Sequence, residues 1–273
     1  MADLTRYRQL WKGARELKCF DLFSRSQRLA RIFARYGFSS FAYDIQSQAS
    51  QDIVSQSGFY EALNAGLMLA DHGLCCAASP CSLFIPISQS VHQRYDWCVN
   101  GNLRNFKVRL SNTIASNTCV LLSLILRFQP MTYLVIEQPK GSFMWKMDYF
   151  RAFFREFSAF ACVLTYLGFW GLDLLKPTHL QTNLPKAKSL ARKATRAAKN
   201  KFAERMRKKH ERMRRAGKEP PIYYKTHVDN GTDGVQKKRF SGTKNLSRTA
   251  EYPQRFVTAL FTCWAATYAA TQQ

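Results

Sequence analysis

Two side chains capable of catalysis each lie where an apolar run gives way to a turn. Cys81 follows Pro80 in the stretch AASPCSLFIPIS (77–88), and Glu137 lies near the end of the apolar run MTYLVIEQP (131–139). A thiol at a turn can become a nucleophile when backbone N–H groups point at the sulfur and lower its pKa. A buried Glu needs a partner, so Glu137 predicts either an acid that handles protons or a salt bridge to a nearby Lys or Arg. The competing interpretation of Cys81 is a buried thiol at a strand end.

Phosphate binding is the second chemistry that the sequence suggests. Residues 186–218 hold 15 Lys or Arg and two Glu, a net charge of about +13, within a chain of net charge +23. Such an excess favours a polyanion, and we expect nucleic acid as the partner. The candidate phosphate contacts are Arg205, Arg207, Lys208 and Lys209 in this segment, and His92, Arg94 and Arg109 elsewhere. A solvated helix face, or a nuclear-import signal, explains the charge run equally well.

Alternating apolar runs and helical patterns must position these residues. Runs with the length of buried strands occupy 17–23, 40–45, 74–80, 131–139, 161–168 and 176–183, and helical spacing occupies 26–36, 58–73, 100–128, 143–157 and 248–270. This alternation predicts an α/β fold, a Rossmann-like doubly wound and mostly parallel sheet of about six or seven strands with helices on both faces. Functional residues should gather past the carboxyl ends of the strands.

An insertion is expected to interrupt this domain. Residues 186–218 are rich in helix formers and predict a basic helix that would be marginal alone, and a polar loop follows it up to residue 244. We therefore expect an α/β domain made of residues 1–185 and 245–273, with residues 186–244 inserted into it.

The stretch FDLFSRSQRLARIFARYGFSSFAYDI (20–45) resembles the first two motifs of class I methyltransferases that use S-adenosylmethionine. It is closest to the DNA cytosine carbon-5 branch, which opens with D-L-F-S-G-x-G-G-L, a helix, G-F, a strand and an acid. The residues that match in place are Asp21, Leu22, Phe23, Ser24, Leu29, Gly37, Phe38 and Asp44. The resemblance implies that S-adenosylmethionine is bound by Asp21, Phe23, Ser24, Asp44, Ile45, Asp52, Ile53 and Pro80, with Asp44 at the ribose hydroxyls and Asp52 at the adenine edge.

The resemblance also implies catalytic roles. In that branch the Cys of a P-P-C turn attacks carbon 6 of cytosine, and the Glu of an E-N-V motif holds the base. Cys81 would then be the nucleophile and Glu137 the base-holding acid. The chain departs from the pattern at Ser79 and Gln138, and no Q-x-R-x-R motif is evident. Amine-directed nucleic-acid methyltransferases have a related turn of the form Asp/Asn/Ser-Pro-Pro-aromatic. Ser79 and Pro80 match the first two positions of that turn, but Cys81 and Ser82 do not match the last two.

The turn glycines of the family are replaced by Arg25, Gln27 and Arg28. A side chain there costs about 1 kcal/mol or more where φ is positive, and it fills the space of the ligand. Two hypotheses follow. The chain is a methyltransferase-like protein that acts on or binds nucleic acid, with an arginine at the methionine carboxylate of the cofactor. Alternatively, it is a catalytically inactive methyltransferase-like fold that binds nucleic acid through its basic helix.

Cysteine usage bears on the compartment. None of the eight cysteines forms a CxxC, and no Cys/His cluster has zinc spacing, so we expect reduced thiols, no metal site and a nuclear or cytoplasmic protein. The first residues contain no apolar run, and the uncharged tail FVTALFTCWAATYAA (256–270) is short for a span of about 20 residues. We therefore expect no membrane contact. The oligomeric state is left open.

Overall fold

A computed structural model describes residues 16–230, 236–242 and 251–273, with backbone alone for 224–230 and 236–242. Six strands form one mixed sheet in the order β2-β1-β3-β4-β6-β5. They are β1 (Leu17–Leu22), β2 (Ser40–Tyr43), β3 (Leu69–Ala77), β4 (Tyr133–Pro139), β5 (Ala161–Tyr166) and β6 (Pro177–Thr182). The pairs β1–β2, β1–β3 and β3–β4 are parallel, whereas β6 runs antiparallel to both β4 and β5. The expected α/β class with a mostly parallel sheet is confirmed.

The strand order places a branch point at β1. The chain passes from β1 to β2 on one side and then to β3 on the other side. Connections that diverge from one strand leave a crevice at the carboxyl ends of the strands, where α/β proteins bind ligands. The residues after β1, β2, β3 and β4 are therefore the ones to inspect for a site.

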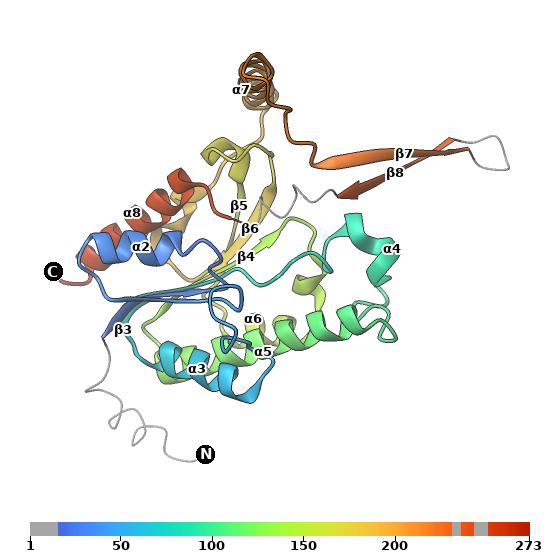
Figure 1. The fold of residues 1–273 in the computed structure, drawn as a ribbon. Coiled ribbons are helices and arrows are strands. Elements are labelled where there is room, and N and C mark those ends of the chain that lie inside the picture. The colour runs from blue at the N-terminus through green and yellow to red at the C-terminus, as the bar shows by residue number, and fades with distance from the viewer. Residues whose placement is uncertain (1–15, 231–235, 243–250) are drawn as a thin grey trace.

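Helices cover both faces of the sheet (Figure 1). One face carries α3 (Gln56–Leu67), α5 (Phe106–Phe128) and α6 (Asp148–Glu156), and the other carries α2 (Arg28–Arg35) and α8 (Gln254–Ala270). Strand side chains alternate between the faces, so Phe20 and Leu22 of β1 join one core and Cys19 joins the other. The two apolar layers fix the orientation of every strand end.

The contact between α2 and α8 is aromatic. In α2 the buried residues Leu29, Ile32 and Phe33 lie on one face, as the helical spacing in the sequence predicts. The Phe33 ring lies with its centroid 5.1 Å from that of Phe261 and 4.4 Å from that of Trp264. This closure joins the beginning of the sheet to a helix formed more than two hundred residues later.

Within the described residues, α5 is the helix long and apolar enough to cross a membrane by length and composition. Nine of its side chains are buried, and it packs on α3 and α6. Its buried stripe is that of a core helix.

Several element boundaries differ from the sequence predictions. The helix expected over 58–73 ends at Leu67, and β3 begins at Leu69. The last helix begins at Gln254, directly after Pro253, rather than at 248. In the basic segment, a 3-10 helix η5 (Pro185–Leu190) is followed by α7 (Arg196–Arg215).

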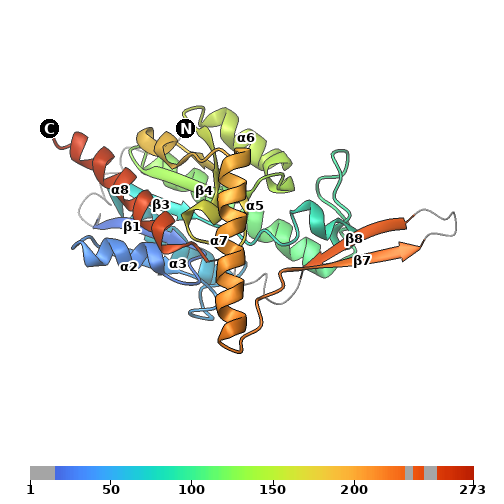
Figure 2. The ribbon, with the colours of Figure 1, turned by 90° about the horizontal axis from the view of Figure 1, so that it is seen from above.

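The expected polar loop contains two strands instead. β7 (Tyr224–Asn230) and β8 (Gln236–Gly242) pair antiparallel and extend away from the body of the molecule (Figures 1 and 2). Figure 2 also shows α7 lying across the outside of the body. The segment that follows β6 therefore contributes a helix and a β-hairpin outside the central sheet.

Candidate functional site

A cavity of about 730 Å³ lies at the carboxyl ends of the parallel strands. Its wall includes Phe23 after β1, Asp44 and Ile45 after β2, Pro80 and Cys81 after β3, and Lys176 before the antiparallel β6. The volume is typical of a small-molecule site. The structure thus brings five of the predicted site residues to one cavity, together with Lys176, to which the sequence assigned no role.

Asp44 is held rigidly at this cavity. Its side chain is buried, and Oδ1 accepts a hydrogen bond from the backbone N–H of Gln46 at 2.7 Å. Its own backbone N–H donates to Oε1 of Gln51 at 2.9 Å, and Gln51 in turn donates to Glu61 at 2.8 Å. A fixed carboxylate at the wall is an acceptor suited to the hydroxyl groups of a ligand.

The Cys81 thiol is not activated in this structure. Burial raises its pKa, the Lys176 ammonium lowers it, and the Glu137 carboxylate raises it again, with a net increase. The lowered pKa that the turn position suggested is therefore wrong for this conformation. A thiol with a raised pKa is largely protonated at neutral pH and is a weak nucleophile.

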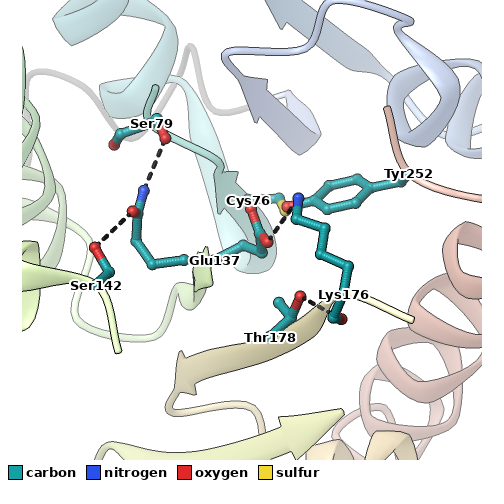
Figure 3. Close-up of polar contacts among 8 residues, drawn as sticks. Cys76, Ser79, Glu137, Ser142, Lys176, Thr178 and Tyr252 are labelled. Atoms are coloured by element: carbon teal, nitrogen blue, oxygen red, sulfur yellow. Dashed lines mark hydrogen bonds and ion pairs between the residues drawn. The ribbon is translucent and has the colours of Figure 1, made fainter. Parts of the chain in front are cut away.

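Glu137 forms the salt bridge that the sequence left open as an alternative. Its Oε1 lies 3.5 Å from Nζ of Lys176, and the two side chains are only 6% and 12% exposed (Figure 3). No hydrogen bond to this oxygen is seen in the part of the chain that the structure describes. Lys176 also has a positive φ of 30°, and strain of this kind concentrates at functional sites. Glu137 is thus a buried acid with a cation as partner, directly behind the cavity wall.

Gln138 joins the ends of β3 and β4. Its Nε2 donates to the carbonyl oxygen of Ser79 at 2.7 Å, and its Oε1 accepts from Oγ of Ser142 at 3.0 Å (Figure 3). Both contacts are buried. Gln138, which replaces the Asn of the E-N-V motif, therefore stabilises the turn that carries Cys81.

Asp21 and Ser24 face away from the main cavity. Asp21 accepts hydrogen bonds from Oγ of Ser24 and from the backbone N–H of Ala30, the latter at 3.2 Å. Burial raises the pKa of Asp21 to about 6, although the bond from Ser24 opposes the increase. The carboxyl group therefore caps the first turn of α2, where orphan N–H groups attract an anion.

The turn at residues 25–28, which lacks the family's glycines, is packed against Glu251 and Tyr252. Arg28 forms an ion pair with Glu251 at 3.0 Å and donates to the carbonyl oxygen of Tyr252 at 2.5 Å. Only about 20 Å³ of space is left between this turn and Tyr252. Among the three replacing residues, Gln27 has a positive φ of 52°. This turn therefore leaves little room for a ligand group, whereas its residues Phe23 and Arg25 also line the larger cavity.

Asp52 and Ile53 do not reach the cavity. Ile53 is 3% exposed and belongs to the core beneath α3. Asp52 turns its carboxylate back to the N–H of Val54 at 3.0 Å, and its carbonyl oxygen accepts from Oγ of Ser55 at 2.8 Å. Asp52 and Ile53 therefore lie apart from the other predicted cofactor contacts, because both residues form the turn that precedes α3.

The predicted phosphate contacts His92 and Arg94 are wrong, since both are fully buried. Arg94 donates to the carbonyl oxygens of Leu83 and Val99 at 2.7 and 2.5 Å, and burial lowers its pKa to about 10. Nδ1 of His92 accepts from the Arg94 N–H at 2.9 Å, so its proton lies on Nε2, which faces the Ile85 carbonyl oxygen at 2.9 Å. Both side chains hold the loop together internally and are out of reach of a phosphate.

The remaining predicted cations are exposed but have partners within the chain. Arg109 donates to the carbonyl oxygen of Leu103 at 2.8 Å, just before α5. Arg205 donates to that of Gly168 at 2.8 Å, and Lys209 pairs with Asp173 at 2.5 Å, so these two attach α7 to the body. Along α7, the ion pairs Arg207–Glu211 and Lys208–Glu204 both measure 2.7 Å.

Other cations of α7 are better placed for a polyanion. They are exposed, and no partner is seen for them among the described residues: Arg196, Lys199, Lys201, Arg212, Arg214 and Arg215. From sequence alone, only Arg207 and Lys208 can be assigned partners, at four residues' separation. The partners of Arg205 and Lys209 are Gly168 and Asp173, which lie in a distant part of the chain.

No protein-family model matches the chain, no curated protein is detectably similar to it, and no solved structure matches its fold. The geometry of the cavity and of α7 is therefore the basis for a functional proposal.

Proposed function

We propose that this protein is a methyltransferase-like α/β protein that takes S-adenosylmethionine or a similar nucleoside ligand in the strand-end cavity and binds nucleic acid through α7. The observation that carries the proposal is the joining of Asp44 and Cys81 at one cavity beside β1. Chain connections that diverge there support a Rossmann-like, doubly wound arrangement. The resemblance of residues 20–45 to the methyltransferase motifs points to the same ligand.

The residues of the cavity fit the ligand on one side. Asp44 would accept hydrogen bonds from the ribose hydroxyls, and Phe23 and Ile45 offer apolar surface to the base. Arg25 also lines the wall, and a guanidinium is suited to a carboxylate. When bound, S-adenosylmethionine supplies an electrophilic methyl group. The turn filled by Arg28 and Glu251 requires the methionine end to lie differently from its position against a glycine turn.

The catalytic form of the proposal sets two conditions on the chain's own residues. The Cys81 thiol must lose its proton to attack a base, which the nearby Lys176 ammonium assists and the Glu137 carboxylate opposes. Glu137 must also exchange its contact with Lys176 for one with the base. Neither condition holds in the present conformation.

These observations favour the second candidate function, a catalytically inactive methyltransferase-like fold that binds nucleic acid through its basic helix. The raised pKa of Cys81 and the filled turn at Arg28 both support it. The two candidates share the fold and the basic helix, and they differ in whether a methyl group is transferred.

Calorimetry with S-adenosylmethionine tests whether the cavity binds this ligand. The native protein should bind, and Asp44→Asn should lose about tenfold or more in affinity, in line with a charged hydrogen-bond acceptor. Asp52→Asn is the matched control, because Asp52 lies away from the cavity. An absence of binding by the native protein, or equal effects of both substitutions, would refute the assignment of the cavity.

Transfer of a labelled methyl group to single-stranded and duplex DNA and RNA then separates the candidates. Transfer that Cys81→Ser abolishes would support the catalytic form. Ligand binding without transfer to any of these acceptors would support the inactive form.

Salt dependence tests the nucleic-acid part. Log affinity for duplex DNA should fall with log salt by about 0.9 for each phosphate contacted. Changing Arg212, Arg214 and Arg215 to Ala should reduce the slope by about 2.7. Arg207→Ala with Lys208→Ala is the matched control, since these two cations pair within the helix. A slope that the triple substitution leaves unchanged would remove α7 as the binding element.

A further inference from the structure

A second cavity, of about 380 Å³, lies between the turn at residues 95–98 and the start of α6. The turn is closed by two backbone hydrogen bonds, from the Tyr95 N–H to the Cys98 carbonyl oxygen at 3.2 Å and from the Cys98 N–H to the Tyr95 carbonyl oxygen at 3.0 Å. Trp97 at its tip and Trp145 in the 3-10 helix η3 (Phe143–Lys146) both line the cavity. Two indole rings from separate segments therefore share one hollow.

Trp97 is 84% exposed. Its ring lies parallel to that of Tyr95, with a centroid separation of 4.8 Å and an interplanar angle of 4°. Burial of a Trp side chain normally contributes strongly to stability, and the exposed ring of Trp97 leaves this apolar area available to a ligand. The stacked pair is a flat platform for a planar group.

The platform is held in place before any ligand arrives. Arg94 grips the turn through the Val99 carbonyl oxygen at 2.5 Å and reaches Asn112 of α5 at 2.7 Å. Gly101, with φ of +69°, packs so closely that a Cβ there would lie 2.3 Å from the His92 carbonyl oxygen. A preorganised platform loses little entropy on binding. The buried guanidinium of Arg94 thus joins the residue after this turn, Val99, to α5.

The wall of this cavity distinguishes between possible ligands. Asp96 pairs with Lys146 at 2.5 Å, and Asp148 and Arg151 add one charge of each sign, so the wall is formally neutral. Aromatic cages that bind a permanent cation attract it through their ring faces. This wall adds no net negative charge that would favour such a cation. A neutral planar group with polar edges suits this combination, and nucleobases have these properties.

We propose that the Trp97 platform and the cavity behind it bind an unstacked nucleobase of a single-stranded nucleic acid. This inference deepens the proposed function, since it rests on nucleic acid as the partner and specifies a single strand with at least one base turned out. Duplex bases are stacked on each other and cannot use the platform.

Fluorescence anisotropy with a labelled single-stranded oligonucleotide tests the proposal. Trp97→Ala should weaken binding about 10- to 100-fold, as expected for one base stacked on an aromatic ring. Trp97→Phe should retain most of the affinity because it keeps a ring. Tyr60→Ala is the matched control, an exposed aromatic of α3 far from the turn in sequence. The same oligonucleotide annealed into a duplex should bind the native protein and Trp97→Ala alike.

A free nucleotide separates this proposal from the proposed function. Titration with GMP should quench tryptophan fluorescence in the native protein and not in Trp97→Ala. Quenching of this kind without binding of any oligonucleotide would leave the base site standing and refute the nucleic-acid function. Oligonucleotide binding that is insensitive to Trp97→Ala would refute the base site and leave the nucleic-acid function standing. Quenching by tetramethylammonium and not by GMP would overturn the base site in favour of a methylated cation.

Discussion

Asp21→Asn should stabilise the protein at neutral pH and lose this effect at acidic pH. The carboxyl group is 3% exposed, and burial raises its pKa to about 6, against about 3.9 for Asp in an unfolded chain. One pKa unit corresponds to about 1.4 kcal/mol, so the shift of roughly two units amounts to about 3 kcal/mol. Asn retains an oxygen that can accept from the Ala30 N–H and carries no charge to desolvate.

The sign follows from the direction of the shift. Between about pH 4 and 6 the folded chain keeps a proton on Asp21 that the unfolded chain has already lost. The contribution of Asp21 to stability is therefore fully present below about pH 4 and is lost as the pH rises through about 6. Because Asn does not titrate, the free energy of unfolding of Asp21→Asn minus that of the native protein should rise by about 2 kcal/mol between pH 4.5 and pH 7.5.

Urea denaturation followed by tryptophan fluorescence, repeated at several values between pH 4.5 and 7.5, measures this difference. Asp71→Asn, at an exposed position of β3, is the control for a general effect of removing a carboxylate. If this difference in the free energy of unfolding changes by less than about 0.5 kcal/mol over the whole pH range, the raised pKa of the buried Asp21 carboxyl group is refuted.

Three further predictions concern the site. Lys176→Met should lower the free energy of unfolding by about 3–5 kcal/mol, because it leaves the buried Glu137 carboxylate unpaired. Adding Glu137→Gln to this variant should recover most of that loss in urea denaturation. Equal losses in the single and the double variant would contradict the pairing. Gln27→Gly should raise the free energy of unfolding by about 0.5–1 kcal/mol by relieving its positive φ, and a decrease in the same assay would show that the strain is negligible. Iodoacetamide at pH 7.5 should alkylate the exposed Cys98 faster than Cys81, whose pKa is raised by burial, and peptide mapping that shows the reverse order would contradict an inactive Cys81.

The strands and the convergence at the cavity could be predicted because they depend on local signals. Each parallel strand is an apolar run, and strand-end residues such as Asp44 and Cys81 meet wherever parallel strands lie side by side. Motif spacing alone was less reliable at Ile53, which lies at the expected position in the sequence but serves the core. An apolar residue near a motif has a competing use in packing that the sequence does not reveal.

Charged residues were the harder part. Arg94 was predicted to contact phosphate, but the carbonyl oxygens of Leu83 and Val99 converge on its side chain once the loop folds. Lys176 received no role because its partner, Glu137, comes from a different strand. In both cases a tertiary contact decides the burial of a charge.

The hairpin of β7 and β8 carried a sequence signal that was not used. Asn230, the last residue of β7, is followed in the sequence by Gly231, and residues 231–235 separate the two seven-residue strands. Asn-Gly is a hairpin signal. The high polarity of the segment outweighed it and led to the prediction of a loop.

The closure of α2 by α8 has a consequence for synthesis of the chain. Roughly 220 residues separate the two helices, and a ribosome adds ~5–20 residues per second, so α2 waits roughly 10 to 45 s for its partner. Throughout that interval the ring of Phe33 lacks the aromatic cover of Phe261 and Trp264. The nascent chain therefore exposes the apolar face of α2 until residues 254–270 have left the ribosome. During this interval chaperones would protect that face from aggregation.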